Sequence, residues 1–286
     1  MSSTAENQSF LAHIAYVLRQ NPITLFAFAM LGLLLFCALF GPALVPYDPL
    51  ASSSEILKPP SWAHWFGTDH LGRDVFSRVI VATRLDMAIS VGAVALSFVA
   101  GSVLGCAAGY WGGWVDTVIS RGLDMIMAFP LFVLAMGIVA ALGNTVENVI
   151  YATAVINTPF YARLVRAEVN IRREAGFVQA ARLAGNSDLR VLALHIFPNA
   201  FPPMMVQVSL NLGWAVLNAA GLSFIGLGVR PPTPEWGIMV AEGANYIISG
   251  EWWLAVFPGF WLMFAVFTFN LLGDGLRDMV DPRQRR

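Results

Sequence analysis

The sequence predicts an all-α polytopic membrane protein with six transmembrane helices. Apolar residues make up 57% of its 286 residues, charged residues make up only 12%, and the mean hydropathy is +0.65. Such a composition is typical of chains whose helices cross a bilayer, not of soluble domains. The charged residues are also unevenly distributed. The uncharged stretches between them reach the length of about 20 residues that a helix needs to span the hydrocarbon core.

The N-terminal part is expected to contribute one span and one outer loop. Residues 1–22 are polar with scattered apolar positions, and we predict that they form a cytoplasmic tail. An N-terminal transmembrane helix is expected over residues 23–47, because its late start and its length differ from the layout of a cleavable signal peptide. Residues 48–86 are hydrophilic and carry prolines and aromatic residues, which predicts an extracytoplasmic loop that rests at the interface.

Five further spans are expected within residues 87–286, the core of the membrane-embedded part. Pro130 falls inside the second of these five, where it is expected to kink the helix. Twelve of the 17 basic residues fall on one side of this arrangement. Because an excess of Lys and Arg marks the cytoplasmic side, both ends of the chain are expected in the cytoplasm. The five spans are expected over residues 87–115, 116–142, 149–161, 200–228 and 252–272.

Small residues recur at every fourth position along the first span of this core. In lipid, helices associate through close packing of small side chains, so this ridge is expected either to hold a neighbouring helix or to line a path through the membrane. The sequence leaves both interpretations open. The ridge consists of Ala93, Ser97, Gly101, Gly105 and Gly109.

One long charged segment, residues 161–199, stands out between two apolar stretches. Six arginines lie within it, which places it on the cytoplasmic side. Its middle, residues 177–185, has the pattern of a short amphipathic helix that ends at Gly185, a residue suited to a left-handed stop. A smooth face for docking is expected to be formed by Phe177, Ala180, Ala181 and Ala184.

This segment resembles the EAA loop of permease subunits of bacterial ABC importers. The resemblance rests on Gln179-Ala180-Ala181, followed by Gly185 and then by His195-Ile196-Phe197-Pro198. Two positions depart from the family pattern, since Gln179 stands where Glu is usual and Phe197 where Leu is usual. In that family the loop forms a coupling helix that docks on the ATPase. The resemblance therefore implies an ATPase interface at Phe177, Gln179, Ala180, Ala181, Arg182, Gly185, Asn186, Ser187 and Asp188.

Two further stretches are similar to the dipeptide/oligopeptide branch of these importers. They are FGTDHLGRDVFSR, residues 66–78, and RPPTPEWG, residues 230–237. The resemblance implies one N-terminal span added to a five-span ABC importer permease core, in a bacterial inner membrane. It also implies four kinds of partner: a second homologous permease, one or two ATP-binding subunits that bind ATP and Mg, an extracytoplasmic solute-binding protein, and membrane lipid.

The sequence lacks the residues that several other functions require. No stretch matches the phosphate-binding G-x-x-x-x-G-K-[ST] pattern, so neither a bound cofactor nor enzyme activity is expected in this chain. His64, Asp69, His70 and Asp74 lack a recognised metal-ligand spacing, and a structural loop is favoured over a metal site. The four histidines of the chain lie outside the expected spans, which argues against an intramembrane hydrolase. The basic residues gather at membrane boundaries and do not favour binding of nucleic acid.

Several alternatives remain open at this point. A stand-alone secondary transporter is the main competing function, although the predicted spans lack the charged group near the midplane that such carriers usually need. Within the importer family, nickel complexes, glutathione and opines are alternatives to peptides as cargo. Residues 229–251 are expected either to receive the binding protein or close an outer gate, or to form a rigid Pro-rich turn anchored at the interface by Trp236.

Overall fold

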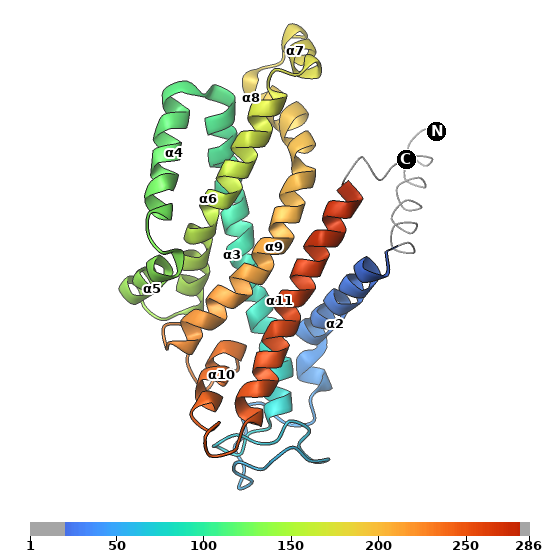
Figure 1. Ribbon diagram of the computed structural model, residues 1–286, viewed down its shortest axis with the longest axis vertical. Helices are drawn as coiled ribbons and strands as arrows, with labels where there is room; N and C mark the ends of the chain where they lie inside the picture. Colours follow the sequence, from blue (N-terminus) through green and yellow to red (C-terminus); the bar gives the residue numbers. More distant parts are fainter. Residues whose placement is uncertain (1–20, 281–286) are drawn as a thin grey trace.

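Long helices packed side by side form the protein, seen in a computed structural model that describes residues 21–280 (Figure 1). These residues contain no β-strand and one isolated bridge, between Thr68 and Asp74. The all-α prediction is confirmed, whereas the predicted tail, residues 1–22, lies almost wholly outside the described residues. In chain order the helices are α2 (Pro22–Leu44), α3 (Val75–Trp111), α4 (Gly113–Met127), α5 (Leu131–Leu142), α6 (Val146–Arg172), α7 (Gly176–Leu183), α8 (Asp188–Val191), the π-helical segment η1 (Leu192–Ile196), α9 (Phe197–Phe224), α10 (Trp236–Ala244) and α11 (Trp253–Val280).

The longest helix, α3, begins earlier than predicted. Asp74 is its N-cap, because its carboxylate accepts a hydrogen bond from the backbone N–H of Ser77 at 2.8 Å. Residues 75–86, which were predicted to belong to the outer loop, are therefore helical. Their charged residues favoured a loop in the sequence, yet the structure buries two of them, Arg78 and Asp86, inside the protein.

The most extensive helix pairing joins α3 and α6, and the small-residue ridge lies in this contact. A Cβ atom added to Gly101 would lie 2.5 Å from the Tyr161 Cβ, and one added to Gly105 would lie 2.5 Å from the Ala162 carbonyl oxygen. Gly109 is similarly close to the Arg166 carbonyl. The three glycines thus let the two backbones approach where a larger residue would separate them. In this chain the ridge packs against α6.

The chain segment that connects α3 to α6 forms a bent pair of helices. α4 and α5 meet at 87° across a short break that contains Pro130, which has no N–H to continue the helical hydrogen bonds. Four described helices are long and apolar enough to cross a membrane, or five if this bent pair counts as one span. α6 has the length, 27 residues, but is not among these helices. The count of six spans stays a prediction.

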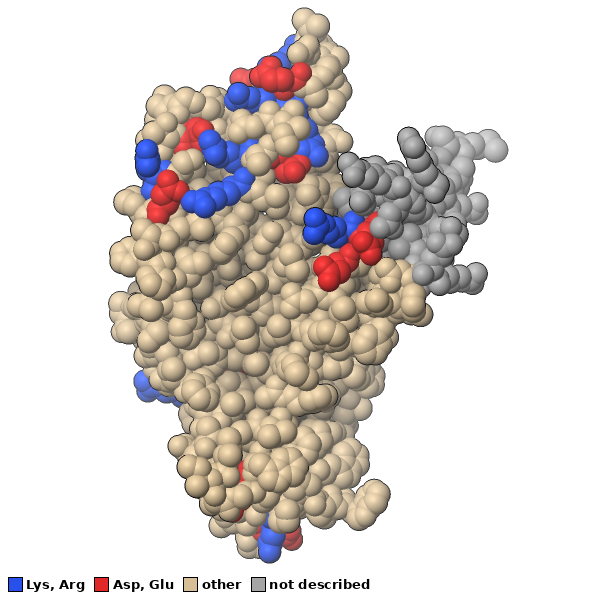
Figure 2. All heavy atoms as spheres, in the orientation of Figure 1, with Lys and Arg blue, Asp and Glu red and all other residues tan. Residues whose placement is uncertain are grey.

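The remaining long helices pack on the other side of α3. α9 and α11 lie against each other, α2 packs on α3 and α11, and α10 fits between α9 and α11. Figure 2 shows charged side chains gathered at the end that carries α7 and near the C-terminal end of α11, with a broad uncharged band across the middle of this face. Such a band is what the hydrocarbon core of a bilayer requires.

Trp236, at the start of α10, lies in the core and not at an interface. It is fully buried, and its Nε1 donates a hydrogen bond to the Val79 carbonyl of α3 at 3.0 Å. The prediction that Trp236 anchors an interfacial turn is therefore wrong. The Pro-rich turn before it directs the ring inward, and the residues after it form a helix.

The α3–α6 contact leads to a test with matched glycine substitutions. Gly105→Ala is expected to lower the apparent free energy of unfolding by about 1–3 kcal/mol, because the added methyl group forces the helices apart. Gly137→Ala in α5 is the control, since a Cβ there meets no other part of the chain within 4 Å. Both variants are unfolded in the same detergent and compared with the parent. Equal effects of the two substitutions would contradict the close packing.

Candidate functional site

The short helix α7 projects at one end of the bundle, called the α7 end below, between α6 and α9 (Figure 1). Its inner side is apolar, with Val178 fully buried and Ala181 8% exposed. These residues are three apart in sequence and therefore share one face of the helix. They join a core cluster that includes Cys106, Val165, Val169, Val191 and Ile196. This apolar contact on its inner side holds α7 against the bundle.

The predicted docking face is split by this orientation. Phe177, Ala180 and Ala184 are exposed, as expected, but Ala181 faces the core. The prediction that Ala181 belongs to the exposed face is wrong, because the pair Val178 and Ala181 supplies the apolar contact that α7 needs. The other exposed residues of the predicted interface are Gln179, Arg182, Gly185, Ser187 and Asp188, and Asn186 is half-buried.

Gly185 ends α7 in the left-handed conformation, with a φ of +81°. The Gly185 N–H donates to the Arg182 carbonyl at 2.9 Å, and the Asn186 N–H donates to the Ala181 carbonyl at 3.3 Å. This is the Schellman arrangement, which satisfies the last carbonyls of a helix. The Asn186 side chain adds a second hydrogen bond to the same Ala181 carbonyl at 2.8 Å. The turn after α7 is thus defined by hydrogen bonds on both sides of the glycine.

A tyrosine at the end of α3 fixes the turn to the bundle. The Tyr110 hydroxyl donates to the Asp188 carboxylate at 2.6 Å, and the Arg182 guanidinium lies 5.3 Å from the centre of the Tyr110 ring. Ser187 is the N-cap residue of α8 by its backbone, and its side chain makes no capping hydrogen bond. The sequence reasoning missed Tyr110, although its place just beyond the small-residue ridge was a usable signal.

Ion pairs link α4 to α6 beside this loop. Arg166 Nε lies 2.5 Å from the Asp116 carboxylate, and Arg163 Nη2 lies 2.7 Å from the Asp124 carboxylate. Together with Ser120 and Arg121, these residues line a polar hollow of about 530 Å³. Arg173 in turn donates to the Gly109 carbonyl at 3.1 Å. These arginines therefore hold α4, α6 and α3 together.

Two acidic side chains are buried at the start of α10. The Asp86 carboxylate of α3 accepts the backbone N–H of Trp236 at 3.1 Å. The Glu235 carboxylate accepts those of Gly237 and Ile238 at 2.9 and 2.8 Å. Burial raises the pKa of the Glu235 carboxyl, whereas the two backbone hydrogen bonds act in the opposite direction. Both groups cap one helix N-terminus and so tie α10 to α3.

The four possible metal ligands of the outer loop take part in three different contacts. His64 Nδ1 lies 2.9 Å from the Asp74 carboxylate, and Asp69 pairs with Arg73. The His70 ring stacks on Tyr246 with 5.8 Å between centroids. Across residues 21–280, no three His, Cys, Asp or Glu side chains come together as metal ligands would. The contacts support the structural-loop interpretation.

The helical bundle and its uncharged band define a polytopic membrane protein. Residues 101–286 match the family of binding-protein-dependent transport system inner membrane components. Residues 9–60 match the N-terminal transmembrane domain of oligopeptide transport permease C. The chain belongs to the family of binding-protein-dependent transport system inner membrane components, whose members are permease subunits of ABC importers and are not themselves enzymes.

Related proteins are permeases of peptide and glutathione systems. The chain is 42% identical over 273 residues to a probable D,D-dipeptide transport system permease of Escherichia coli (strain K12), with 95% of this chain and 91% of that protein covered. It is 39% identical to a glutathione transport system permease of Pectobacterium atrosepticum, with 88% and 84% covered. The fold is similar to a chain of the inward-facing MetNI methionine ABC transporter, with a TM-score of 0.57, 17% identity, and coverage of 71% of this chain and 97% of that one.

The Schellman turn leads to a test of α7 itself. Gly185→Val is expected to cost about 1–2 kcal/mol, because a β-branched residue is strained in the left-handed conformation. Amide exchange at Ala184, whose N–H bonds to the Ala180 carbonyl, is then expected to accelerate by roughly 5–30-fold.

Two controls separate backbone strain from side-chain bulk. Gly185→Asn keeps a residue that tolerates the left-handed region and should exchange nearly as the parent does. Gly176→Val, at the other end of α7, adds its Cβ where no other part of the chain lies within 4 Å. Equal exchange rates in the Gly185→Val and Gly185→Asn proteins would show that the turn does not depend on φ.

Proposed function

We propose that this chain is the permease subunit of a peptide importer and that the outer face of α7 docks on an ATP-binding subunit. The observation that carries the docking proposal is Leu183, which is 91% exposed at the tip of α7. Phe177 and Leu189 on either side of it are 46% and 67% exposed. The exposed charged residues Arg182, Asp188 and Arg190 are their neighbours in the chain, so this loop lies in water and lipid tails do not cover these apolar groups. An apolar patch with a charged rim is typical of a protein contact.

The polar residues of the loop shape this docking surface. Gln179 Nε2 donates to the Glu174 carbonyl at 3.1 Å, which leaves its amide oxygen to accept a hydrogen bond from the partner. Arg182 is held by Tyr110, and the turn of Gly185, Asn186, Ser187 and Asp188 is held by its own hydrogen bonds. Ala181 contributes through packing inside this chain. The preformed loop loses little conformational freedom on binding, which favours affinity.

The other partners follow from the importer proposal. We propose that a second permease binds at the apolar hollow of about 450 Å³ between α5, α9, α10 and α11, where exposed Trp214, Leu217 and Phe224 lie on its wall. We further propose that the end opposite α7 is extracytoplasmic and receives the solute-binding protein. Both chain ends are cytoplasmic, in line with the arginines near α7 and in the last residues. ATP and Mg bind to the ATPase partners, and lipid covers the uncharged band.

Peptides are the proposed cargo. Two related permeases, from Escherichia coli and Alkalihalophilus pseudofirmus, carry D,D-dipeptide and dipeptide transport in their names, at 42% and 40% identity. Glutathione, itself a small peptide, is the alternative that the glutathione permeases at 39–41% identity favour. Membership of the importer family argues against the stand-alone secondary carrier.

The docking proposal predicts a specific loss on charging the α7 tip. Leu183→Asp is expected to reduce copurification of the ATP-binding subunits and their binding-protein-stimulated ATP turnover by roughly ten-fold or more, because a buried charge replaces an apolar anchor. Ile248→Asp is the control for copurification alone, since Ile248 is 99% exposed near the opposite end, where the solute-binding protein is proposed to dock. The variants are expressed with the neighbouring transporter genes and assayed in nanodiscs.

Two outcomes would overturn the proposals separately. If the Leu183→Asp assembly retains parental ATP turnover, α7 is not the docking helix. If the assembly is intact but D,D-dipeptides, dipeptides and glutathione fail to bind its solute-binding protein and to enter proteoliposomes, the cargo assignment is wrong while the docking proposal stands.

A further inference from the structure

Two buried carboxyl groups, Asp86 of α3 and Glu235 at the N-cap of α10, meet at one helix end. Asp86 is 3% exposed and Glu235 is 0% exposed. Asp86 accepts the backbone N–H of Trp236, and Glu235 accepts those of the next two residues, so both groups lie at the first turn of α10. The two side chains also hydrogen-bond to each other. Ionised carboxylates can only accept hydrogen bonds, so this bond needs a proton on one of the two groups.

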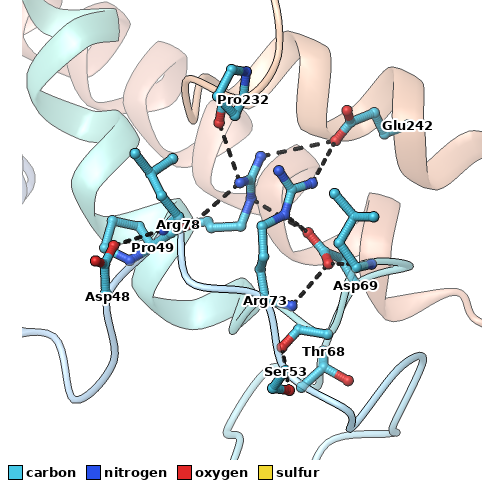
Figure 3. A network of polar contacts seen from close by, with 12 residues as sticks. Asp48, Pro49, Ser53, Thr68, Asp69, Arg73, Arg78, Pro232 and Glu242 are labelled. Atoms are coloured by element: carbon cyan, nitrogen blue, oxygen red, sulfur yellow. Dashed lines mark hydrogen bonds and ion pairs between the residues drawn. The ribbon is translucent and has the colours of Figure 1, made fainter.

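The nearest buried arginine does not neutralise this pair. Arg78 lies about two turns before Asp86 on α3. Figure 3 shows its guanidinium turned toward Asp69 and Glu242, with which it forms ion pairs of 3.7 and 3.9 Å. None of the ion pairs among residues 21–280 includes Asp86 or Glu235. Arg78 therefore serves other carboxylates.

The other elements packed here supply no positive charge either. Arg84 of α3 and Arg230, in the segment before α10, are both exposed. Glu242, the other charged residue of α10, is itself acidic. The sequence of α9 holds no charged residue, and α11 holds none from Trp253 to Gly273. Two ionised carboxylates in contact, buried and without a cation, repel each other strongly, so one of them stays protonated.

The hydrogen bonds indicate which carboxyl group holds the proton. Glu235 accepts two backbone N–H groups and also bonds to the hydroxyl of Ser223 on α9. The Ser223 Oγ accepts the N–H of Val229 at 3.1 Å, which leaves its own hydrogen free to donate to Glu235. Asp86 accepts only the N–H of Trp236 from the backbone. Because donors stabilise the charged form, the negative charge belongs on Glu235 and the proton on Asp86.

We propose that Asp86 and Glu235 share one proton and that this proton holds α10 against α3 and α9. The contact leaves no room for the helix to adjust, since a Cβ added to Gly237 would lie 2.2 Å from the Ala220 carbonyl oxygen of α9. When the proton leaves, two negative charges face each other inside this close contact, and the attachment of α10 weakens. The inference rests on neither the docking proposal nor the cargo proposal.

The direction of the pH effect follows from the number of protons. The closed contact holds one proton between the two carboxyl groups. In water the same groups have a pKa of about 4, so above about pH 5 they hold none once α10 has detached. Detachment therefore releases one proton and becomes about ten-fold more favourable with each unit of pH. The attachment is strongest in acid and weakens as the pH rises.

Amide exchange in the complete transporter in nanodiscs tests this dependence. From roughly pH 5.5 to 7.5, the protection factors of residues 236–244, corrected for intrinsic exchange, should fall about ten-fold per pH unit. Asp86→Asn should make them independent of pH, because its amide oxygen accepts from Trp236 and its NH₂ group donates permanently to Glu235. Asp48→Asn, at an exposed carboxyl group of the outer loop, is the control and should keep the parental slope. A parent without this slope, or an Asp86→Asn protein that keeps it, would overturn the proposal.

Infrared spectroscopy observes the proton directly in the parent protein. The transporter is prepared near neutral pH, in a detergent without ester groups, with this chain labelled with ¹³C at the aspartate carboxyl carbon. A carboxylic-acid C=O band is expected that shifts with the label and is missing from the Asp86→Asn protein. Absence of any such band from the parent would show that both groups are ionised. A band that shifts only when glutamate is labelled instead would overturn the assignment of the proton to Asp86.

Discussion

The close approach of α3 to α6 is the contact on which the rest of this structure depends. Without side chains at Gly101, Gly105 and Gly109, the two backbones meet, and this sets the positions of both helix ends at the α7 end of the molecule. Tyr110 then reaches Asp188, and Arg173 reaches the Gly109 carbonyl. The short helix α7 has too few residues to be stable alone. It is ordered because the α3–α6 pair presents an apolar surface and a tyrosine hydroxyl to it.

A second constraint concerns charge in a chain that lies mostly in lipid. Charged groups away from water need partners, and the described helices supply them locally. Asp116 and Asp124 on α4 meet arginines of α6, so α4 is held beside α6 despite the sharp bend before α5. At the other end, Asp86 and Glu235 use backbone N–H groups of α10 as partners. These charged residues thus fix the positions of helices that could slide along one another if only their apolar surfaces were in contact.

The sequence predicted the helical class, the position of the α7 loop and the stop at Gly185, because composition, charge clustering and a glycine each have a local physical meaning. It did not predict which side of α7 faces the bundle. Either Val178 or Ala180 could lie on the apolar side of an amphipathic helix, and only the positions of the neighbouring helices decide between them. The sequence did not predict that a helix begins at Val75, because the charges of Arg78 and Asp86 indicated side chains exposed to solvent. Their burial depends on partners more than 100 residues away, Pro232 and Trp236, which no local pattern reveals.

The helix α3 connects the two polar regions of the molecule. Its 37 residues make a rod of roughly 55 Å. One end carries Asp74, Arg78 and Asp86, which hold the outer loop and α10, and the other carries Tyr110, which holds the turn after α7. The glycine ridge lies between them and fixes the rod to α6. Because α3 is continuous between these contacts, it sets the distance between the turn after α7 and the outer loop.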